Sequence, residues 1–94
     1  MVTLFVKHSV EDFRNWKVVY DEFGSTRRTL GVTGASVHQD PQDPNMLTVT
    51  HQFATMDAAQ AFANSNELKN AMMNAGVVGR PDVWITTDVE RTAY

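Results

Sequence analysis

The sequence predicts an α+β fold in which helices cover one face of a four-stranded antiparallel sheet. Four segments alternate apolar and polar residues, which is the pattern of half-buried strands. Apolar residues recur at helical spacing in the stretches after the first and third strands, whereas turn-forming residues alone separate the second strand from the third. The predicted order is therefore β, α, β, β, α, β, with the last helical stretch divided in two.

The first strand is predicted over residues 2–8, and a helix follows it. Ser9 has the character of a helix N-cap, with Asp12 in the capping-box position three residues later, and Gly24 is a suitable stop. Aromatic residues lie at helical spacing between these limits: Phe13, Trp16, Tyr20 and Phe23. We interpret this stripe as the surface that packs on the sheet, in preference to an aromatic box for a cofactor.

The second and third strands are predicted over residues 35–40 and 46–53. Two Asp-Pro pairs and an asparagine fill the segment 40–45, which indicates a surface hairpin connection, since proline does not continue a paired strand interior. The third strand has an unusual apolar face because it includes a histidine: Leu47, Val49, His51 and Phe53.

Two short helices and a last strand complete the prediction. Thr55 and Ser65 are the expected N-caps of helices with the sequences "MDAAQAFA" and "NELKNAMMNAG", and Gly76 ends the second of them. The segment "GVVGRP" is interpreted as a turn-rich link to a strand over residues 82–90.

This order is the split-βαβ, or ferredoxin-like, arrangement. Its sheet has one face under helices, and the other face is either solvated or covered by a partner. Apolar residues occur on both faces, since Phe5 opposes Leu4 on the first strand and Trp84 opposes Ile85 on the last. We therefore predict one domain over residues 1–94 that forms a homodimer, a dimeric α+β barrel in which two sheets face each other around a partly apolar interior.

Composition excludes several classes of function. The formal net charge is −3, and acidic and basic residues are interspersed along the chain. A protein that binds a phosphate backbone needs a basic surface, so no nucleic-acid partner is expected. The absence of cysteine excludes disulfides, thiolate catalysis and cysteine-ligated metal centres. No apolar run approaches the roughly 20 residues that span a bilayer, and the N-terminus lacks the pattern of a signal peptide. We expect a soluble cytoplasmic protein with no membrane partner.

Residues 43–72 read "DPNMLTVTHQFATMDAAQAFANSNELKNAM" and combine a strand ending in an aromatic residue, an acidic residue, an alanine-rich helix start and an S-x-x-L-K motif. The residues concerned are Phe53, Asp57, Ala58, Ala59, Ser65, Leu68 and Lys69. In this pattern and in its element order, nearly the whole chain resembles the dimeric α+β-barrel superfamily. That group includes antibiotic biosynthesis monooxygenases, haem-degrading monooxygenases, muconolactone isomerases and stress-responsive barrel proteins.

The resemblance implies a role for the histidine of the third strand. In the haem-degrading branch, a tryptophan near the position of Phe53 points into the barrel cavity. Residues two apart on a strand share a face, so a cavity-facing Phe53 would bring His51 and Val49 with it as ligand contacts. A histidine in an apolar cavity is neutral near pH 7 and can take or give a proton, which makes His51 the predicted acid–base residue. The alternative is a neutral core histidine satisfied by a hydrogen bond.

Three further residues are candidates for the same cavity. An asparagine near the position of His8 faces the cavity in the haem-degrading branch, which implies a second catalytic histidine at its rim. Trp84 is a candidate cavity wall, with packing on the helix side as the alternative. The haem-ligating histidine of that branch would fall near Ala71 or Met72, so haem is not expected, and Met72 is counted among the ligand contacts.

The remaining charged and metal-binding residue types give weaker signals. His38 is interpreted as a surface residue, and the spacing of the three histidines does not indicate a metal site, so neither a metal nor another cofactor is expected. Arg27 and Arg28 could reach an anionic substrate at the barrel mouth, although a solvated pair is the commoner arrangement.

Two functions stay open. The first is a cofactor-independent monooxygenase, cyclase or isomerase that deprotonates a small aromatic or polyketide-like substrate through His51. The second is a non-catalytic small-molecule binder or stress-responsive barrel protein, since one fold hosts many functions. An apolar cavity holding both His8 and His51 would favour the enzyme, whereas a filled cavity with a hydrogen-bonded His51 would favour the alternative.

Overall fold

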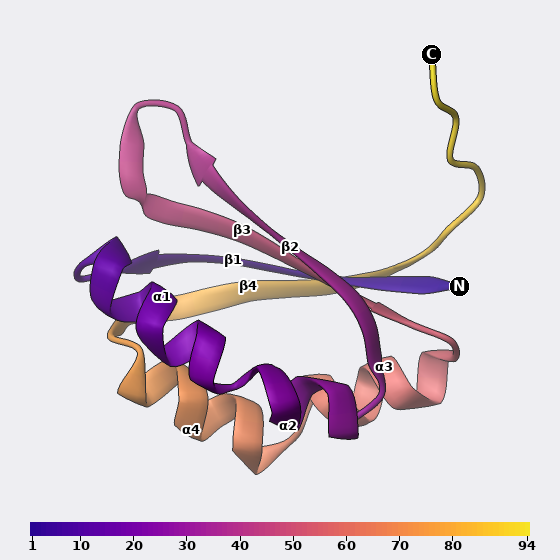
Figure 1. Ribbon diagram of the computed structural model, residues 1–94, viewed down its shortest axis with the longest axis horizontal. Helices are drawn as coiled ribbons and strands as arrows, with labels where there is room; N and C mark the ends of the chain where they lie inside the picture. The colour runs from indigo at the N-terminus through magenta and orange to yellow at the C-terminus, as the bar shows by residue number, and fades with distance from the viewer.

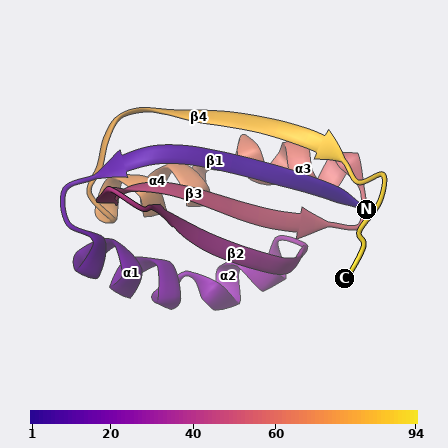
Figure 2. The same ribbon diagram turned by 90° about the horizontal axis from the view of Figure 1, so that it is seen from above.

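Two layers, a sheet and a set of helices, make up the computed structural model, which describes residues 1–94 (Figure 1). The strands are β1 (Val2–Val10), β2 (Val32–Asp40), β3 (Asp43–Phe53) and β4 (Val77–Thr87). The helices are α1 (Phe13–Glu22), α2 (Gly24–Thr29), α3 (Met56–Ala63) and α4 (Asn66–Asn74). The strands pair antiparallel in the order β2-β3-β1-β4, and the helices all lie on one side of the sheet (Figures 1 and 2). The predicted ferredoxin-like α+β fold is therefore confirmed.

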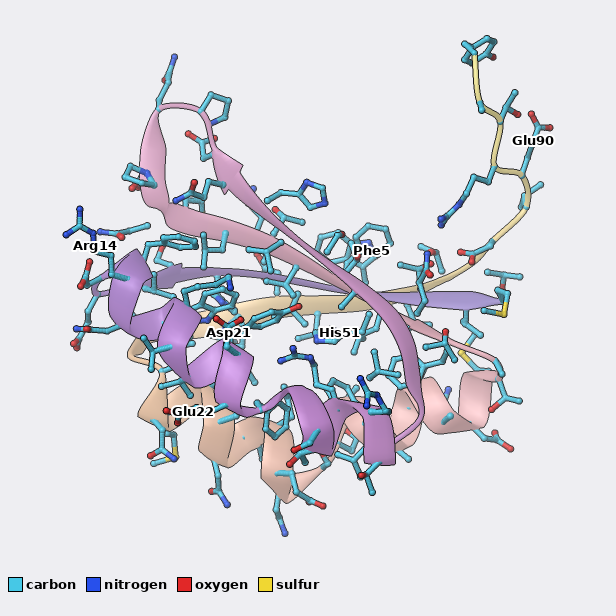
Figure 3. All side chains as sticks on the ribbon, viewed as in Figure 1. Phe5, Arg14, Asp21, Glu22, His51 and Glu90 are labelled. Atoms are coloured by element: carbon cyan, nitrogen blue, oxygen red, sulfur yellow. The ribbon has the colours of Figure 1, made fainter.

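The pairing register decides which side chains face the helices. Leu4 lies opposite His51, and Val6 lies opposite Val49. Side chains opposite each other share a face of the sheet, and these four are at most 4% exposed because the helix layer covers them. Figure 3 shows His51 on the helix side of the sheet and Phe5 on the opposite, open side.

Two hydrophobic clusters hold the helices on the sheet. The first is centred on Phe53 and Phe62, whose rings lie 5.4 Å apart and join α3 to β3. The second is centred on Trp16, which stacks between Phe13 and Tyr20 at centroid distances of 6.0 and 4.9 Å. Burying an aromatic side chain of this kind contributes roughly 2–3 kcal/mol. The aromatic stripe of α1 thus packs on the sheet, as the sequence predicts.

The first helix begins later than expected. The last residues of β1 pair with the first residues of β4, so Ser9 is a strand residue and not an N-cap. Asp12 occupies the N-cap position, but its side chain makes no capping hydrogen bond. The backbone N–H of Phe13 instead donates to Oδ1 of Asn45 at 2.9 Å. A residue distant in sequence therefore caps α1, which local patterns do not reveal.

Three segments predicted as connections contain regular structure. The predicted hairpin link 40–45 is shorter than expected, because Asp40 still belongs to β2 and residues 43–45 already belong to β3. Residues 24–29 form α2, a helix of Gly, Ser, Thr and Arg that lacks the apolar periodicity by which a helix is recognised. Residues 77–81 form the first part of β4, where Pro81 is tolerated because β4 is an edge strand. The strand ends at Thr87, so residues 88–90 lie beyond the predicted strand that included them.

The predicted ends of α3 and α4 are confirmed. Oγ1 of Thr55 accepts from the N–H of Ala58 at 3.2 Å, and Oγ of Ser65 accepts from the N–H of Leu68 at 3.1 Å. Gly76 has a φ of 77°, the left-handed conformation that ends a helix without the steric cost of a Cβ.

Replacing the cap of α4 tests this assignment. Ser65→Ala is expected to lower the free energy of unfolding by about 1 kcal/mol, because the N–H of Leu68 loses its acceptor. Ser25→Ala is the matched control, since Ser25 is exposed in α2 and caps no helix; its effect should stay within about 0.5 kcal/mol. Urea denaturation at one fixed protein concentration measures both. Equal losses for the two variants would contradict the capping role.

Candidate functional site

A pocket with a cavity volume of about 40 Å³, partly open to solvent, lies between the sheet and the helices. Its floor consists of Val6 and His8 from β1 together with Val49 and His51 from β3. Residues of α1 and α2 form one wall, and the opposite wall contains the apolar side of the last helix: Leu68, Ala71, Met72 and Ala75. Ten of the thirteen lining residues are hydrophobic, so the pocket suits a largely apolar ligand.

The pocket's position corrects one expectation. The face that holds His51 was expected to line a cavity between the sheets of two subunits, but it packs under the helices of its own chain. The opposite face of β3 carries Thr48, Thr50 and Gln52, and it is this face that the helices leave open. Helices cover the apolar face because burying it removes more apolar surface from water.

Both histidines on the pocket floor are buried without hydrogen-bond partners. His8 is 6% exposed and His51 is 4% exposed. Neither ring nitrogen of His8 has a partner, and Nδ1 of His51 has none. Because buried polar atoms are nearly always satisfied, these nitrogens indicate where a polar group of a ligand, or water, would bind. His51 is therefore not the hydrogen-bonded core histidine that was the alternative interpretation.

The surroundings keep both imidazoles neutral. Burial lowers the pKa of His51 to about 4, and the positive charge of Arg27 contributes to the lowering. Burial also lowers the pKa of His8. Each ring thus carries one N–H donor and one acceptor nitrogen at pH 7.

The two histidines lie at opposite ends of the floor. His8 pairs with Leu47, whereas His51 pairs with Leu4, so four residues separate them along the strands. At about 3.4 Å per residue this is roughly 14 Å, with the Val6–Val49 pair midway. The His8 ring contacts Trp16 at 5.9 Å, and the His51 ring contacts Phe62 at 5.0 Å. They do not form a dyad, and a ligand has to be elongated to reach both.

Arg27 is the one residue with a permanent charge among those that line the pocket. Its guanidinium carbon lies 3.7 Å from the centroid of the Tyr20 ring, and Nη1 donates to the Tyr20 carbonyl at 2.6 Å. The sequence favours a solvated arginine pair, but only Arg28 is exposed and Arg27 is half-buried. Arg27 follows Tyr20 by seven residues, which is two helical turns, so the spacing places both on one side once the helix is known to resume after Phe23.

The other predicted site residues divide between the two faces. Val49 and Met72 line the pocket with the histidines. Phe53 shares the helix-facing side but is fully buried in the neighbouring cluster and does not line the pocket. Trp84, expected to share the same cavity, lies on the open face instead, because it pairs with Phe5 in register and stacks on that ring at 5.2 Å.

His38 lies apart from the other histidines. It is exposed on β2, as predicted, and its Nε2 is 2.9 Å from Oγ of Ser36. The three histidines of the chain therefore do not converge on one point.

Comparison with known proteins identifies the architecture. No protein-family model matches the sequence, and no curated protein matches it. A candidate antibiotic biosynthesis monooxygenase from Bordetella bronchiseptica superposes with a TM-score of 0.80 at 14% identity, covering 95% of this chain and 97% of that one. SnoaB, a cofactor-independent oxygenase from Streptomyces nogalater, gives a TM-score of 0.78 at 11% identity, covering 96% of this chain and 94% of that one.

The chain has the antibiotic biosynthesis monooxygenase fold. A candidate antibiotic biosynthesis monooxygenase from Nitrosomonas europaea has a TM-score of 0.76 at 15% identity, with 96% of this chain and all of that one covered. The resemblance inferred from residues 43–72 is thus confirmed at the level of the fold. At these identities, the shared fold does not assign a reaction. None of the helices is long and apolar enough to cross a membrane.

The pKa of His51 predicts how stability depends on pH. At pH 5 the unfolded histidine, with a pKa of 6.5, is protonated, whereas the native ring stays neutral until about pH 4. The unfolded state then binds a proton that the native state does not, so stability falls as pH drops from about 6.5 toward 4. We expect His51 to account for a loss of about 2 kcal/mol between pH 7.5 and pH 5.

Urea denaturation of the wild type and His51→Gln at both pH values measures this contribution. On acidification from pH 7.5 to pH 5, the free energy of unfolding of the variant should fall by about 2 kcal/mol less than that of the wild type. Some loss should remain, because burial also lowers the pKa of His8. His38→Gln is the matched control, because His38 is exposed, and it should retain the wild-type dependence. The same pH dependence in all three proteins would contradict the buried, neutral state of His51.

Proposed function

We propose that this protein is a cofactor-independent monooxygenase or cyclase that acts on a small aromatic or polyketide-like, enolisable substrate. The observation that carries the proposal is the pocket itself, where the unpartnered His51 and the fixed charge of Arg27 meet an otherwise apolar lining. A neutral imidazole can take a proton from a carbon beside a carbonyl, and a guanidinium held nearby stabilises the enolate that forms. SnoaB, which shares the fold, is a cofactor-independent oxygenase and supports this reaction class.

The oxygenase reaction balances with the substrate and O₂ alone. His51 accepts a proton from a substrate methylene, and the resulting carbanion gives its electron pair to O₂. The hydroperoxide that forms takes the proton back and loses water, so CH₂ and O₂ become C=O and H₂O. In a cyclase the same carbanion would instead attack a carbonyl carbon of its own chain. His8, at the far end of the floor, would orient the substrate, with Val49 and Met72 contacting its apolar body.

One observation favours a second candidate, a non-catalytic small-molecule binder of the kind to which a stress-responsive barrel protein would belong. A pKa of about 4 makes His51 a weak base in the empty pocket. As a binder, the pocket would use His51 and His8 only as hydrogen-bond partners. An enolate beside His51 would raise the pKa of the histidine, because a negative charge favours the protonated ring. Only the enzyme would turn a substrate over, so a turnover assay distinguishes the two candidates.

We also propose that the protein is a homodimer formed through the open face of the sheet. This face presents the stacked rings of Phe5 and Trp84, with Trp84 43% exposed. Hydroxyl and amide side chains of β3 share this face, on the side of Phe5 away from Trp84: Thr48, Thr50 and Gln52. Aromatic residues with satisfiable polar neighbours are typical of protein interfaces.

Turnover of an aromatic enolisable ketone tests the enzymatic proposal. With anthrone as the probe, the wild type should consume O₂ in an oxygen electrode without added cofactor. His51→Ala should lower kcat by about 10²- to 10⁴-fold, which is the usual contribution of a general base. His38→Ala is the control and should leave kcat unchanged, since His38 lies on the exposed strand β2. Undiminished turnover by His51→Ala would overturn the role of His51, and binding of anthrone without turnover by the wild type would favour the binder.

Sedimentation velocity tests the dimer. The wild type should sediment at twice the monomer mass, and Trp84→Glu should sediment as a monomer, because a carboxylate replaces the exposed ring of the stack. Val18→Glu is the matched control, since Val18 is 56% exposed on α1 and lies on the helix side. A monomeric wild type at micromolar concentration would contradict the proposed barrel.

A further inference from the structure

We propose that Arg27 makes this pocket selective for an aromatic acid, binding the ligand's carboxylate between its guanidinium and His51. The inference deepens the proposed function and rests on it in one respect, namely that the same pocket receives the substrate. It adds the charge of the ligand and the residue that recognises that charge.

The charges that line the pocket are not balanced. Among the lining residues there is one cation, two neutral histidines and no carboxylate. The one ion pair in the structure joins Lys17 to Asp21, at 2.6 Å, so Arg27 has no acidic partner. A guanidinium has five N–H donors, and the Tyr20 carbonyl is the one acceptor that the structure gives it. A half-buried cation with free donors in an apolar pocket is complementary to an anion.

The guanidinium of Arg27 is already held in place. It lies flat over Tyr20, whose ring in turn stacks on Trp16 at 4.9 Å. Ligand binding therefore has to order little of the arginine side chain, which removes an entropy cost that a solvated arginine would bear.

His51 provides a second group for the same ligand. Arg27 and His51 line the same pocket, in which the other side chains are mostly apolar. Nδ1 of His51 is buried without a partner. One carboxylate oxygen can accept from the guanidinium while the other accepts the N–H of the neutral imidazole. This arrangement satisfies both groups at once, whereas a neutral ligand leaves the cation uncompensated.

Acidic groups also lie near the entrance. A groove between α1–α2 and α4 adjoins the pocket, sharing Val19, Phe23 and Ala71 with it, and Glu22 and Glu67 line this groove. Both glutamates are exposed, so solvent screens their repulsion of an incoming anion. They would attract a cation to the groove instead, which makes a cationic probe the necessary counter-test.

Three probes of one shape and different charge separate these possibilities. We would titrate the full-length protein with 2-naphthoate, 2-naphthamide and 2-naphthylmethylammonium at pH 7.5, by isothermal calorimetry. The naphthoate should bind at least about tenfold more tightly than the amide, as hydrogen bonds to charged groups allow. Arg27→Gln should remove this preference, Arg27→Lys should retain part of it, and the exposed Arg28→Gln should leave it intact. The lysine variant keeps the inference testable if the glutamine variant does not fold.

Several outcomes would overturn the inference. They are equal binding of naphthoate and naphthamide, tightest binding of the ammonium probe, no binding of naphthoate at millimolar concentration, and an unchanged preference in Arg27→Gln. The titrations involve no turnover, so an anion preference in a protein that fails to oxidise anthrone would leave this inference standing without the oxygenase. Turnover of anthrone by a protein with no preference for naphthoate would overturn this inference alone.

Discussion

The two-residue alternation of the central strands is the constraint on which the site depends. β1 and β3 lie in the middle of the sheet, and their register places His8, Val6, Val49 and His51 on one face. A shift of one residue in either strand would turn its histidine to the open face. Apolar neighbours hold the register, because any shift would also expose buried side chains such as Leu4. Hydrophobic packing of the two strands therefore fixes the positions of the two histidines in the pocket.

The helices add the electrostatic character of the pocket. By covering the sheet they remove water from both imidazoles, which lowers their pKa values and keeps them neutral. Tyr20 brings Arg27 to the same space through a cation–π contact and a carbonyl hydrogen bond. A permanent positive charge beside a neutral base is an arrangement that favours anions and carbanions alike. The oxygenase and the binder would both use it, and they differ in whether His51 moves a proton.

Features whose cause lies within a few residues could be predicted from the sequence. The caps Thr55 and Ser65 and the stop at Gly76 were found because each acts within its own turn. Prediction failed at α2, which has no apolar periodicity, and at Ser9, where pairing with a distant strand overrides a capping pattern. The expectation that the face of His51 lies between two sheets was also wrong, because this face lies under the helices. Alternation shows that a strand has two different faces, but it does not show what covers each of them.

By itself the sequence determined the element order, the class of fold and the face that Val49, His51 and Phe53 share, since these follow from periods of two and of 3.6 residues. Only the tertiary structure decided that this face lies under the helices, that Phe53 packs beside the pocket, and that Trp84 stacks with Phe5 on the opposite side. It also placed Arg27 of α2 and His51 of β3 in the lining of one pocket. The physical reason is that side-chain direction is a local property of the backbone, whereas proximity between elements depends on how the layers pack.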